Sequence, residues 1–179
     1  MPLFHVRRAT KKTSIALIGF MGVGKSTLGA LLAQKASLGF FDIDAQIEAD
    51  TGMSISQIFD ACGEKFFRDA EHEMCKKIST MERFVISCGG GIVLNPQNIT
   101  LLQQNCTVAH LTASPETIFN RTAIEKNRPL LAEGDKLAKI KTLLAEREHL
   151  YKQSADFSVC TEDKTPDELI SELLKALKV

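Results

Sequence analysis

The chain has 179 residues, of which 44% are hydrophobic and 25% are charged, the size and composition of one globular domain. Lys plus Arg and Asp plus Glu number 22 each, so no overall charge attracts the chain to nucleic acid or to an anionic membrane. No apolar run is long enough to span a bilayer, and we expect neither nucleic acid nor a membrane as a partner.

The first 13 residues carry four basic side chains and are expected to form a mobile arm (1–13) ahead of a single domain (14–179). The arm is a poor signal peptide, because the apolar stretch after it is broken by glycines and a lysine. The five cysteines are scattered without a Cys-x-x-Cys pair, which favours free thiols in a reducing compartment. We therefore expect a cytoplasmic protein.

A glycine-rich motif follows the first predicted strand, Ser14–Ile18. Its sequence, Gly19-Phe20-Met21-Gly22-Val23-Gly24-Lys25-Ser26-Thr27, fits Gly-x-x-x-x-Gly-Lys-Ser/Thr at every fixed position. Leucines at helical spacing come next, so the motif opens a helix whose N-terminus points at a bound phosphate. We expect Lys25 at the β- and γ-phosphates and Ser26 on Mg²⁺. The alternative is a glycine turn that only closes a βα unit.

Strands and helices are predicted to alternate along the rest of the chain, the pattern of a parallel sheet covered by helices. Further strands are expected at 40–42, 83–87, 107–112 and 156–160. Helices are expected from a capping box at residue 54 to about 61, at 64–79 after a break at Gly63, at 95–104 and 135–151, and after Ser114-Pro115 and Thr165-Pro166. One compact α/β domain results.

Asp42 and Asp44 end the second predicted strand, at the sheet edge where ligands bind in open α/β folds. If the strand continues through them, both carboxylates face the same way. One could then hold the water shell of Mg²⁺ while the other meets a substrate hydroxyl. Because neither of the next two predicted strands ends in Asp, Asp42 is the candidate for the metal. The alternative is that Asp44 caps a helix and Asp42 is a surface charge.

Two further features indicate a pocket for a small anion. Arg68 and Glu71 share one face of a predicted helix, where Arg68 either binds a substrate carboxylate, oriented by Glu71, or forms an ordinary exposed ion pair. Gly89, Gly90 and Gly91 close a strand. Close approach of a small ligand to the backbone explains three consecutive glycines better than a tight turn does.

Three more arginines are candidates for binding anions: Arg121, Arg128 and Arg147. Arg128 lies in a polar segment that we interpret as a lid (about 125–135) folding over the phosphates. Arg147 lies between two glutamates on a predicted helix, and a solvated helix face is the alternative there. The four histidines form no cluster in the sequence and are assigned no function.

Taken in order, these elements resemble the shikimate kinase family. The resemblance covers nearly all of the chain after residue 13 and rests on the phosphate motif, Asp42-Ile43-Asp44, Phe67-Arg68-Asp69-Ala70-Glu71, the three glycines, Arg128-Pro129-Leu130-Leu131, and Glu146-Arg147 with Leu150-Tyr151. It implies a three-layer α/β sandwich, in which helices flank a five-stranded parallel sheet as in P-loop NTPases and nucleoside monophosphate kinases. It also implies a substrate-binding region at about 43–80.

The resemblance implies ATP-dependent phosphorylation of the 3-hydroxyl of shikimate, in the chorismate route to aromatic amino acids, with Mg²⁺ as cofactor and the protein as a monomer. The implied catalytic residues are Lys25, Asp44 and Arg128. The implied nucleotide contacts are Gly22, Val23, Gly24, Lys25, Ser26, Thr27, Arg121 and Arg128, and the implied metal site is Ser26 with Asp42. The implied substrate contacts are Asp44, Arg68, Glu71, Gly89, Gly90, Gly91 and Arg147.

The sequence departs from the family pattern at few positions. Cys88 stands where threonine is common, and the segment 161–165 on the adenine side is not distinctive. Two other functions remain open. Another small-metabolite or nucleotide kinase on the same scaffold would lack the paired Arg68 and Arg147. A GTP-dependent switch would need a guanine-binding Asn-Lys-x-Asp motif, which the sequence lacks, although residues 60–63 fit Asp-x-x-Gly.

Overall fold

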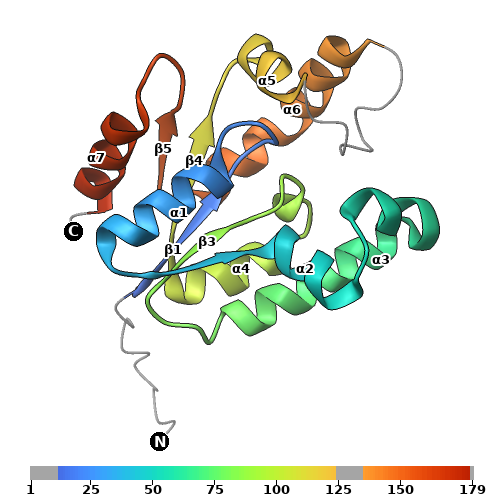
Figure 1. The fold of residues 1–179 in the computed structure, drawn as a ribbon, viewed down its shortest axis with the longest axis horizontal. Coiled ribbons are helices and arrows are strands. Elements are labelled where there is room, and N and C mark those ends of the chain that lie inside the picture. Colours follow the sequence, from blue (N-terminus) through green and yellow to red (C-terminus); the bar gives the residue numbers. More distant parts are fainter. Residues whose placement is uncertain (1–11, 124–134, 178–179) are drawn as a thin grey trace, which may run out of the picture.

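The computed structural model describes residues 12–123 and 135–177. Almost all of the predicted arm and of the predicted lid therefore lies outside the described residues. One sheet of five parallel strands, in the order β2-β3-β1-β4-β5, forms the centre of the fold (Figure 1). The strands are β1 (Ser14–Ile18), β2 (Gly39–Asp42), β3 (Phe84–Ser87), β4 (Cys106–Thr112) and β5 (Phe157–Cys160).

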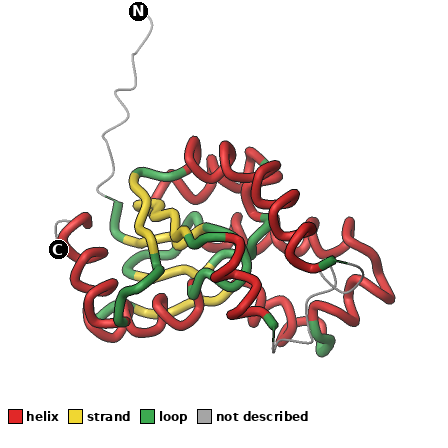
Figure 2. Tube along the Cα trace, turned by 90° about the horizontal axis from the view of Figure 1, so that it is seen from above, coloured by secondary structure: helices red, strands yellow, loops and turns green. Residues whose placement is uncertain are grey.

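Helices flank the sheet and complete three layers, so the predicted α/β sandwich is confirmed (Figure 2). None of the helices in the described parts of the chain is long and apolar enough to cross a membrane. The helices are α1 (Lys25–Ala36), α2 (Ile43–Thr51), α3 (Ile55–Ile78), α4 (Pro96–Asn105), α5 (Pro115–Thr122), α6 (Lys136–Ser154) and α7 (Pro166–Leu177), with a 3₁₀ turn, η1 (Ile92–Leu94).

The central strand β1 shows why both faces of the sheet are covered. Its five residues are all buried, and the side chains of the last four alternate between two apolar cores. Ile15 and Leu17 pack in the core that includes residues of α1 and α7, whereas Ala16 and Ile18 pack in the core that includes residues of α3 and α4. Burial on both faces explains why this strand is a continuous apolar run in the sequence.

Local hydrogen bonds set most helix boundaries where the sequence predicted them. Ser54 Oγ accepts from Gln57 N at 3.3 Å and Gln57 Oε1 accepts from Ser54 N at 2.8 Å, which is the expected capping box. Gly63 interrupts α3 with φ of 81°, and Asn95 and Ser114 cap α4 and α5. All five cysteines are free; three are buried and two are exposed: Cys75, Cys88 and Cys106, and Cys62 and Cys160.

The segment after β2 differs from the prediction. The strand ends at Asp42 and α2 begins at Ile43, so the expectation of one strand carrying both carboxylates on the same face is wrong. Asp42 is the N-cap of α2, because its Oδ1 accepts from Ala45 N at 3.1 Å. Asp44 lies in the first turn of the helix, and the buried pair Ile43 and Ile47 anchors that helix in the core.

His110, to which the sequence assigned no function, is buried in β4. Its ring stacks on Tyr151 of α6, with ring centroids 5.0 Å apart, and 3% of the residue is exposed. Burial lowers the pKa of His110 from 6.5 to about 4. Between these two values the unfolded chain binds a proton at this position that the folded chain does not bind.

The unfolding free energy should therefore fall as the pH is lowered from 6.5 toward 4, because protonation of His110 favours the unfolded state. We predict that His110→Asn loses less stability than the parent chain over this window, since Asn has no proton to take up. Urea denaturation at several pH values measures the difference. Parallel pH profiles for the two proteins would contradict the prediction.

Candidate active site

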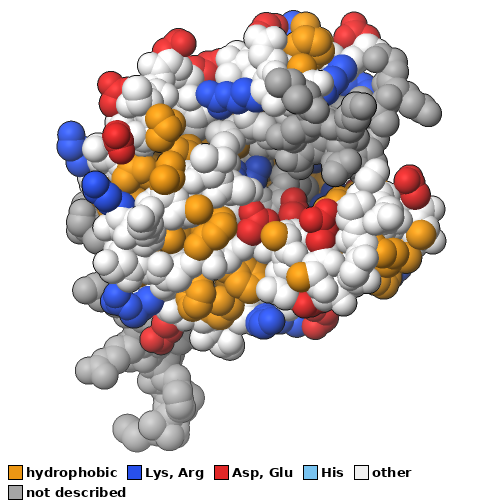
Figure 3. Space-filling view, in the orientation of Figure 1, with side chains coloured by type: hydrophobic (Ala, Val, Ile, Leu, Met, Phe, Trp, Pro, Cys, Tyr) orange, Lys and Arg blue, Asp and Glu red, His pale blue; other side chains and the backbone are white. Residues whose placement is uncertain are grey.

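The phosphate loop, residues 19–27, leads from the carboxyl end of β1 into α1. Gly24 is the N-cap of α1 with φ of 96°, a left-handed conformation that favours glycine. A cavity of about 270 Å³ opens beside the loop. Residues of the loop line it together with residues of α2, β3 and its following segment, and α5: Met21, Gly22, Gly24, Lys25, Ser26 and Thr27 with Asp44, Ser87, Cys88, Gly90 and Arg121. Figure 3 shows that this face is hollowed near its centre, with basic side chains recessed in the hollow and acidic side chains near its rim.

Lys25 is folded across the loop. Its Nζ donates to the carbonyl oxygens of Gly19 at 2.9 Å and Phe20 at 2.8 Å, and only 8% of the residue is exposed. A buried ammonium needs such acceptors, and phosphate oxygens are stronger ones because they are charged. Val23 differs from its neighbours: its side chain packs in the apolar core, so its backbone rather than its side chain is available to a phosphate.

Ser87 lies in the site although it was not among the residues predicted from the sequence. The Ser26 and Ser87 hydroxyl oxygens lie 3.2 Å apart. Ser87 is the last residue of β3 and lies in register with Asp42 on β2. Its sequence signal is that it is a polar residue at the carboxyl end of the strand beside β1, where ligands bind. An Asp was expected at such a position, so the serine did not stand out.

No group of three or more His, Cys, Asp or Glu side chains in the described ranges is arranged to hold a metal ion. A metal bound here would need hydroxyl, water and phosphate oxygens, which is how Mg²⁺ is commonly held beside a nucleotide. Ser26 offers such an oxygen. The carboxylate of Asp42 is partly buried and caps α2.

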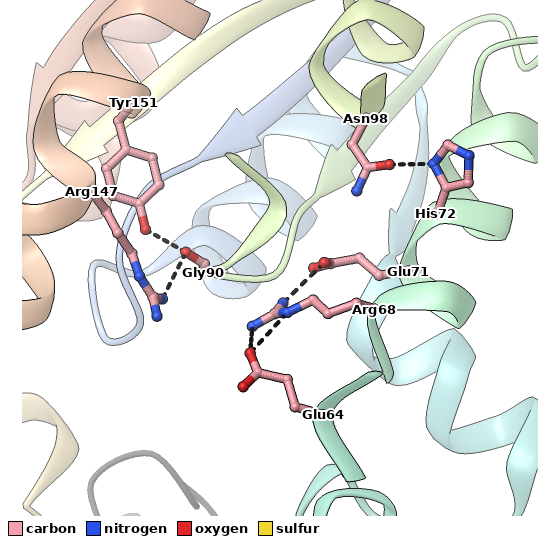
Figure 4. A network of polar contacts seen from close by, with 8 residues as sticks. All are labelled: Glu64, Arg68, Glu71, His72, Gly90, Asn98, Arg147 and Tyr151. Atoms are coloured by element: carbon pink, nitrogen blue, oxygen red, sulfur yellow. Dashed lines mark hydrogen bonds and ion pairs between the residues drawn. The ribbon is translucent and has the colours of Figure 1, made fainter. Parts of the chain in front are cut away.

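Arg68 is held between two glutamates on α3. Its Nη1 donates to Glu71 Oε2 at 3.0 Å and its Nη2 donates to Glu64 Oε1 at 3.0 Å (Figure 4). Glu71 is 1% exposed, so the pair is not the ordinary exposed ion pair of the alternative interpretation. Burial raises the pKa of Glu71 to about 7, although Arg68 opposes the shift. Within the described chain, Glu71 Oε1 has no hydrogen-bond partner.

Residues 89–91, here called the glycine segment, lie against side chains of this site. A Cβ added at Gly89 would lie 2.7 Å from Glu71 Oε1 and 2.8 Å from Asp44 Oδ1. A Cβ added at Gly91 would lie 2.3 Å from Arg68 Nη1. The sequence predicted that a small ligand approaches the backbone of these glycines. In the structure, two carboxylates and one guanidinium of the protein itself occupy the space beside Gly89 and Gly91.

Gly90 joins the phosphate loop to α6. A Cβ at Gly90 would lie 3.2 Å from Met21 N in the loop. The Gly90 carbonyl oxygen accepts from the Tyr151 hydroxyl and, at 3.5 Å, from Arg147 Nη1 (Figure 4). Arg147 is 6% exposed, so it does not lie on a solvated helix face. Arg68 and Arg147 thus reach the same three glycines from α3 and from α6.

Arg121 connects α5 to the segment after β5. Its Nη1 donates to Thr161 Oγ1 at 2.9 Å and its Nη2 donates to the Thr161 carbonyl at 2.8 Å. Thr161 lies in the segment that was not distinctive in the sequence, and this pairing across the fold could not be read from it. Arg128 lies outside the described residues.

Comparison with known proteins identifies the family. Residues 21–178 match the family model described as shikimate kinase. The shikimate kinase of Thermodesulfovibrio yellowstonii is 44% identical over 162 residues, which cover 90% of this chain and 93% of that protein. The shikimate kinase of Neisseria gonorrhoeae is 42% identical over 163 residues, 91% of this chain and 95% of that protein.

Solved structures agree with the sequence matches. The shikimate kinase of Acinetobacter baumannii in complex with shikimate superposes with a TM-score of 0.90 at 32% identity and covers 93% of each chain. A gluconokinase of Sinorhizobium meliloti, at 13% identity and a TM-score of 0.57, covers 93% of this chain and 92% of its own and shares the fold alone. The chain therefore belongs to the shikimate kinase family.

Proposed function

We propose that this chain transfers the γ-phosphoryl group of ATP to the 3-hydroxyl of shikimate. The observation that carries the proposal is the junction at the glycine segment, which lies against the phosphate loop on one side and against Arg68, Glu71 and Asp44 on the other. Because Asp44 and Gly90 line the same cavity as the phosphate loop, the triphosphate and the small anionic alcohol are proposed to bind next to each other. The A. baumannii relative was solved with shikimate bound.

The nucleotide half of the site would act by positioning and by positive charge, which are the main requirements of phosphoryl transfer. Lys25 would exchange its two loop carbonyls for phosphate oxygens, and the backbone of Gly22, Val23 and Gly24 would bind the same phosphates. We assign Ser26, Thr27 and Arg121 to the nucleotide as well, and Arg128 to the charge that develops in the transition state, from a lid at about 125–135. That lid lies outside the described residues.

The substrate half would bind the carboxylate and orient the hydroxyl. Arg68 and Arg147 are proposed to bind the carboxylate, because guanidinium groups match its two oxygens. The substrate oxygen attacks the γ-phosphorus, the bond to the β–γ bridging oxygen breaks, and ADP leaves. Asp44, which lines the cavity, is proposed to accept the hydroxyl hydrogen bond and take the proton.

Mg²⁺ is proposed at Ser26 and Asp42, completed by water and phosphate oxygens. When bound, the ion neutralises charge on the β- and γ-phosphates. The pair of hydroxyls, Ser26 and Ser87, supports an oxygen-lined site at the loop. By the family resemblance we also propose a substrate-binding region at about 43–80, a monomer and a cytoplasmic location.

A substrate panel tests the proposal. ADP release would be measured with shikimate, gluconate and nucleoside monophosphates as acceptors, and with ATP and GTP as donors. The proposal requires turnover with ATP and shikimate, at a rate on the order of 1–100 per second. Turnover only with another acceptor would contradict the proposal and would indicate a different small-metabolite or nucleotide kinase. Tight GTP binding without ATP binding would support the switch.

Lys25→Ala should lower kcat by about 100-fold or more, because the transferring phosphoryl group loses a charged partner. Lys35→Ala is the matched control, since this lysine lies in the last turn of the same helix and is exposed. Initial rates and thermal unfolding of both variants measure the effect. Full activity in Lys25→Ala would refute the phosphate role.

Gly91→Ala should raise the KM for shikimate about 10-fold or more and change the KM for ATP little, because the new Cβ would displace the Arg68 guanidinium. Arg68→Ala should act in the same direction. Lys65→Ala is the control, since it removes an exposed basic side chain from the same helix as Arg68. An unchanged shikimate KM in Gly91→Ala and Arg68→Ala would show that Arg68 forms only a structural ion pair and does not bind the substrate.

Asp42→Asn should raise the Mg²⁺ concentration needed for half-maximal activity about 10-fold, because the metal loses a charged neighbour. Asn still caps a helix well, so α2 should be retained. Asp50→Asn makes the same charge change at an exposed position of α2 and serves as the control. Magnesium titrations at saturating ATP measure the shift, and identical titrations for both variants would remove Asp42 from the metal site.

A further inference from the structure

Tyr151 is a buried residue of the site to which the proposed function gives no task. We infer that its hydroxyl is a positioning group: it holds the Gly90 carbonyl so that Arg147 remains available for the substrate carboxylate. The inference rests on the proposed function and extends it, since Tyr151 itself would touch neither substrate nor nucleotide. Its effect would pass through Gly90 and Arg147.

The ring of Tyr151 is fixed before any ligand binds. The residue is fully buried, and its ring lies against the imidazole of His110 at an interplanar angle of 20°. Its hydroxyl donates to the Gly90 carbonyl oxygen. Burial raises the pKa of Tyr151 to about 12, so the phenol keeps its proton and remains a donor throughout the neutral pH range.

Arg147 competes for the same acceptor. It lies four residues before Tyr151 on α6, so both side chains project from one helix face toward Gly90 (Figure 4). The separation of Arg147 Nη1 from the Gly90 oxygen, 3.5 Å, is at the long limit of a hydrogen bond. Arg147 also interacts with the Tyr151 hydroxyl, so this hydroxyl contacts both the Gly90 carbonyl and the guanidinium. Without the hydroxyl, the guanidinium would move toward the carbonyl and away from an incoming carboxylate.

The same hydrogen bond also fixes the glycine segment. The carbonyl of Gly90 belongs to the peptide unit that connects Gly90 to Gly91. Gly91 lies against the guanidinium of Arg68. On its other side Gly90 lies close to Met21 N of the phosphate loop. One hydroxyl thus positions the peptide that lies between both arginines. Loss of the hydroxyl should therefore weaken substrate binding more than it slows the chemical step.

Tyr151→Phe tests the inference because it keeps the ring and its stacking and removes only the donor. We would measure the dissociation constants of shikimate and of its carboxamide analogue, together with kcat and the KM values for shikimate and ATP. The expected result is a shikimate affinity lower by about 3- to 10-fold. The preference for carboxylate over carboxamide should fall by the same factor, while kcat and the KM for ATP stay within about twofold.

Ser154→Ala is the matched control. Ser154 Oγ donates to the Leu150 carbonyl at 2.7 Å within the same helix, so its removal costs a similar part-buried hydrogen bond without touching Gly90. Thermal unfolding should report comparable losses of stability in the two variants, and ligand affinity should change only in Tyr151→Phe. Equal weakening of carboxylate and carboxamide binding in Tyr151→Phe would indicate a merely structural role and overturn the inference.

A second measurement needs no substitution that removes the hydroxyl. The chain has one Tyr, so 3-fluorotyrosine places a single ¹⁹F probe at Tyr151. Saturating shikimate should shift its NMR signal, and the carboxamide should shift it less. An unmoved signal would overturn the inference while leaving the proposed kinase activity intact. A parent chain that neither binds nor phosphorylates shikimate would instead remove the proposed function, and the inference with it.

Discussion

The site depends on the absence of side chains at residues 89–91. This segment follows β3, the strand beside the central strand β1, and lies against the phosphate loop, the Arg68–Glu71 pair of α3, and Arg147 and Tyr151 of α6. A Cβ at Gly89 or Gly91 would displace the Glu71, Asp44 or Arg68 side chain, and a Cβ at Gly90 would press on the backbone of the phosphate loop. Phosphoryl transfer requires donor and acceptor in close and fixed contact, so a segment that lets them approach is itself part of the machinery.

Buried charge is the second feature of the site, and it follows from the first. Lys25, Glu71 and Arg147 are nearly inaccessible, and each has protein partners that offset part of the desolvation cost. The Arg68–Glu71 pair is in place before a ligand arrives, and a bound carboxylate would have to share the Arg68 guanidinium with Glu71 and Glu64. Among the described residues, Lys25 and Arg147 donate to carbonyl oxygens, which a charged ligand can replace. The charged side chains of the site are therefore held in place before a ligand binds, and some of them can exchange a carbonyl group for the ligand.

How far the sequence could be interpreted depended on how local each interaction is. Capping boxes, proline at the start of a helix and the break at Gly63 involve residues within a few positions of each other, and those boundaries agree with the structure. At Asp42 and Asp44 the sequence leaves two interpretations open, a strand through both residues or a helix capped by Asp44, and the structure shows a helix capped by Asp42. A cap at Asp42 and the buried pair Ile43 and Ile47 favour the helix instead.

The phosphate loop and its helix were determined by the sequence alone, because their geometry is set by neighbouring residues and by glycine's access to positive φ. The sequence also supplied Arg68, Glu71 and Arg147 as candidates, but not their burial. Only the tertiary structure decided that Ser87 meets Ser26, that Arg121 meets Thr161 and that Tyr151 meets Gly90. These contacts join residues at least 40 positions apart, and the packing of helices on the sheet, not any local pattern, brings them together.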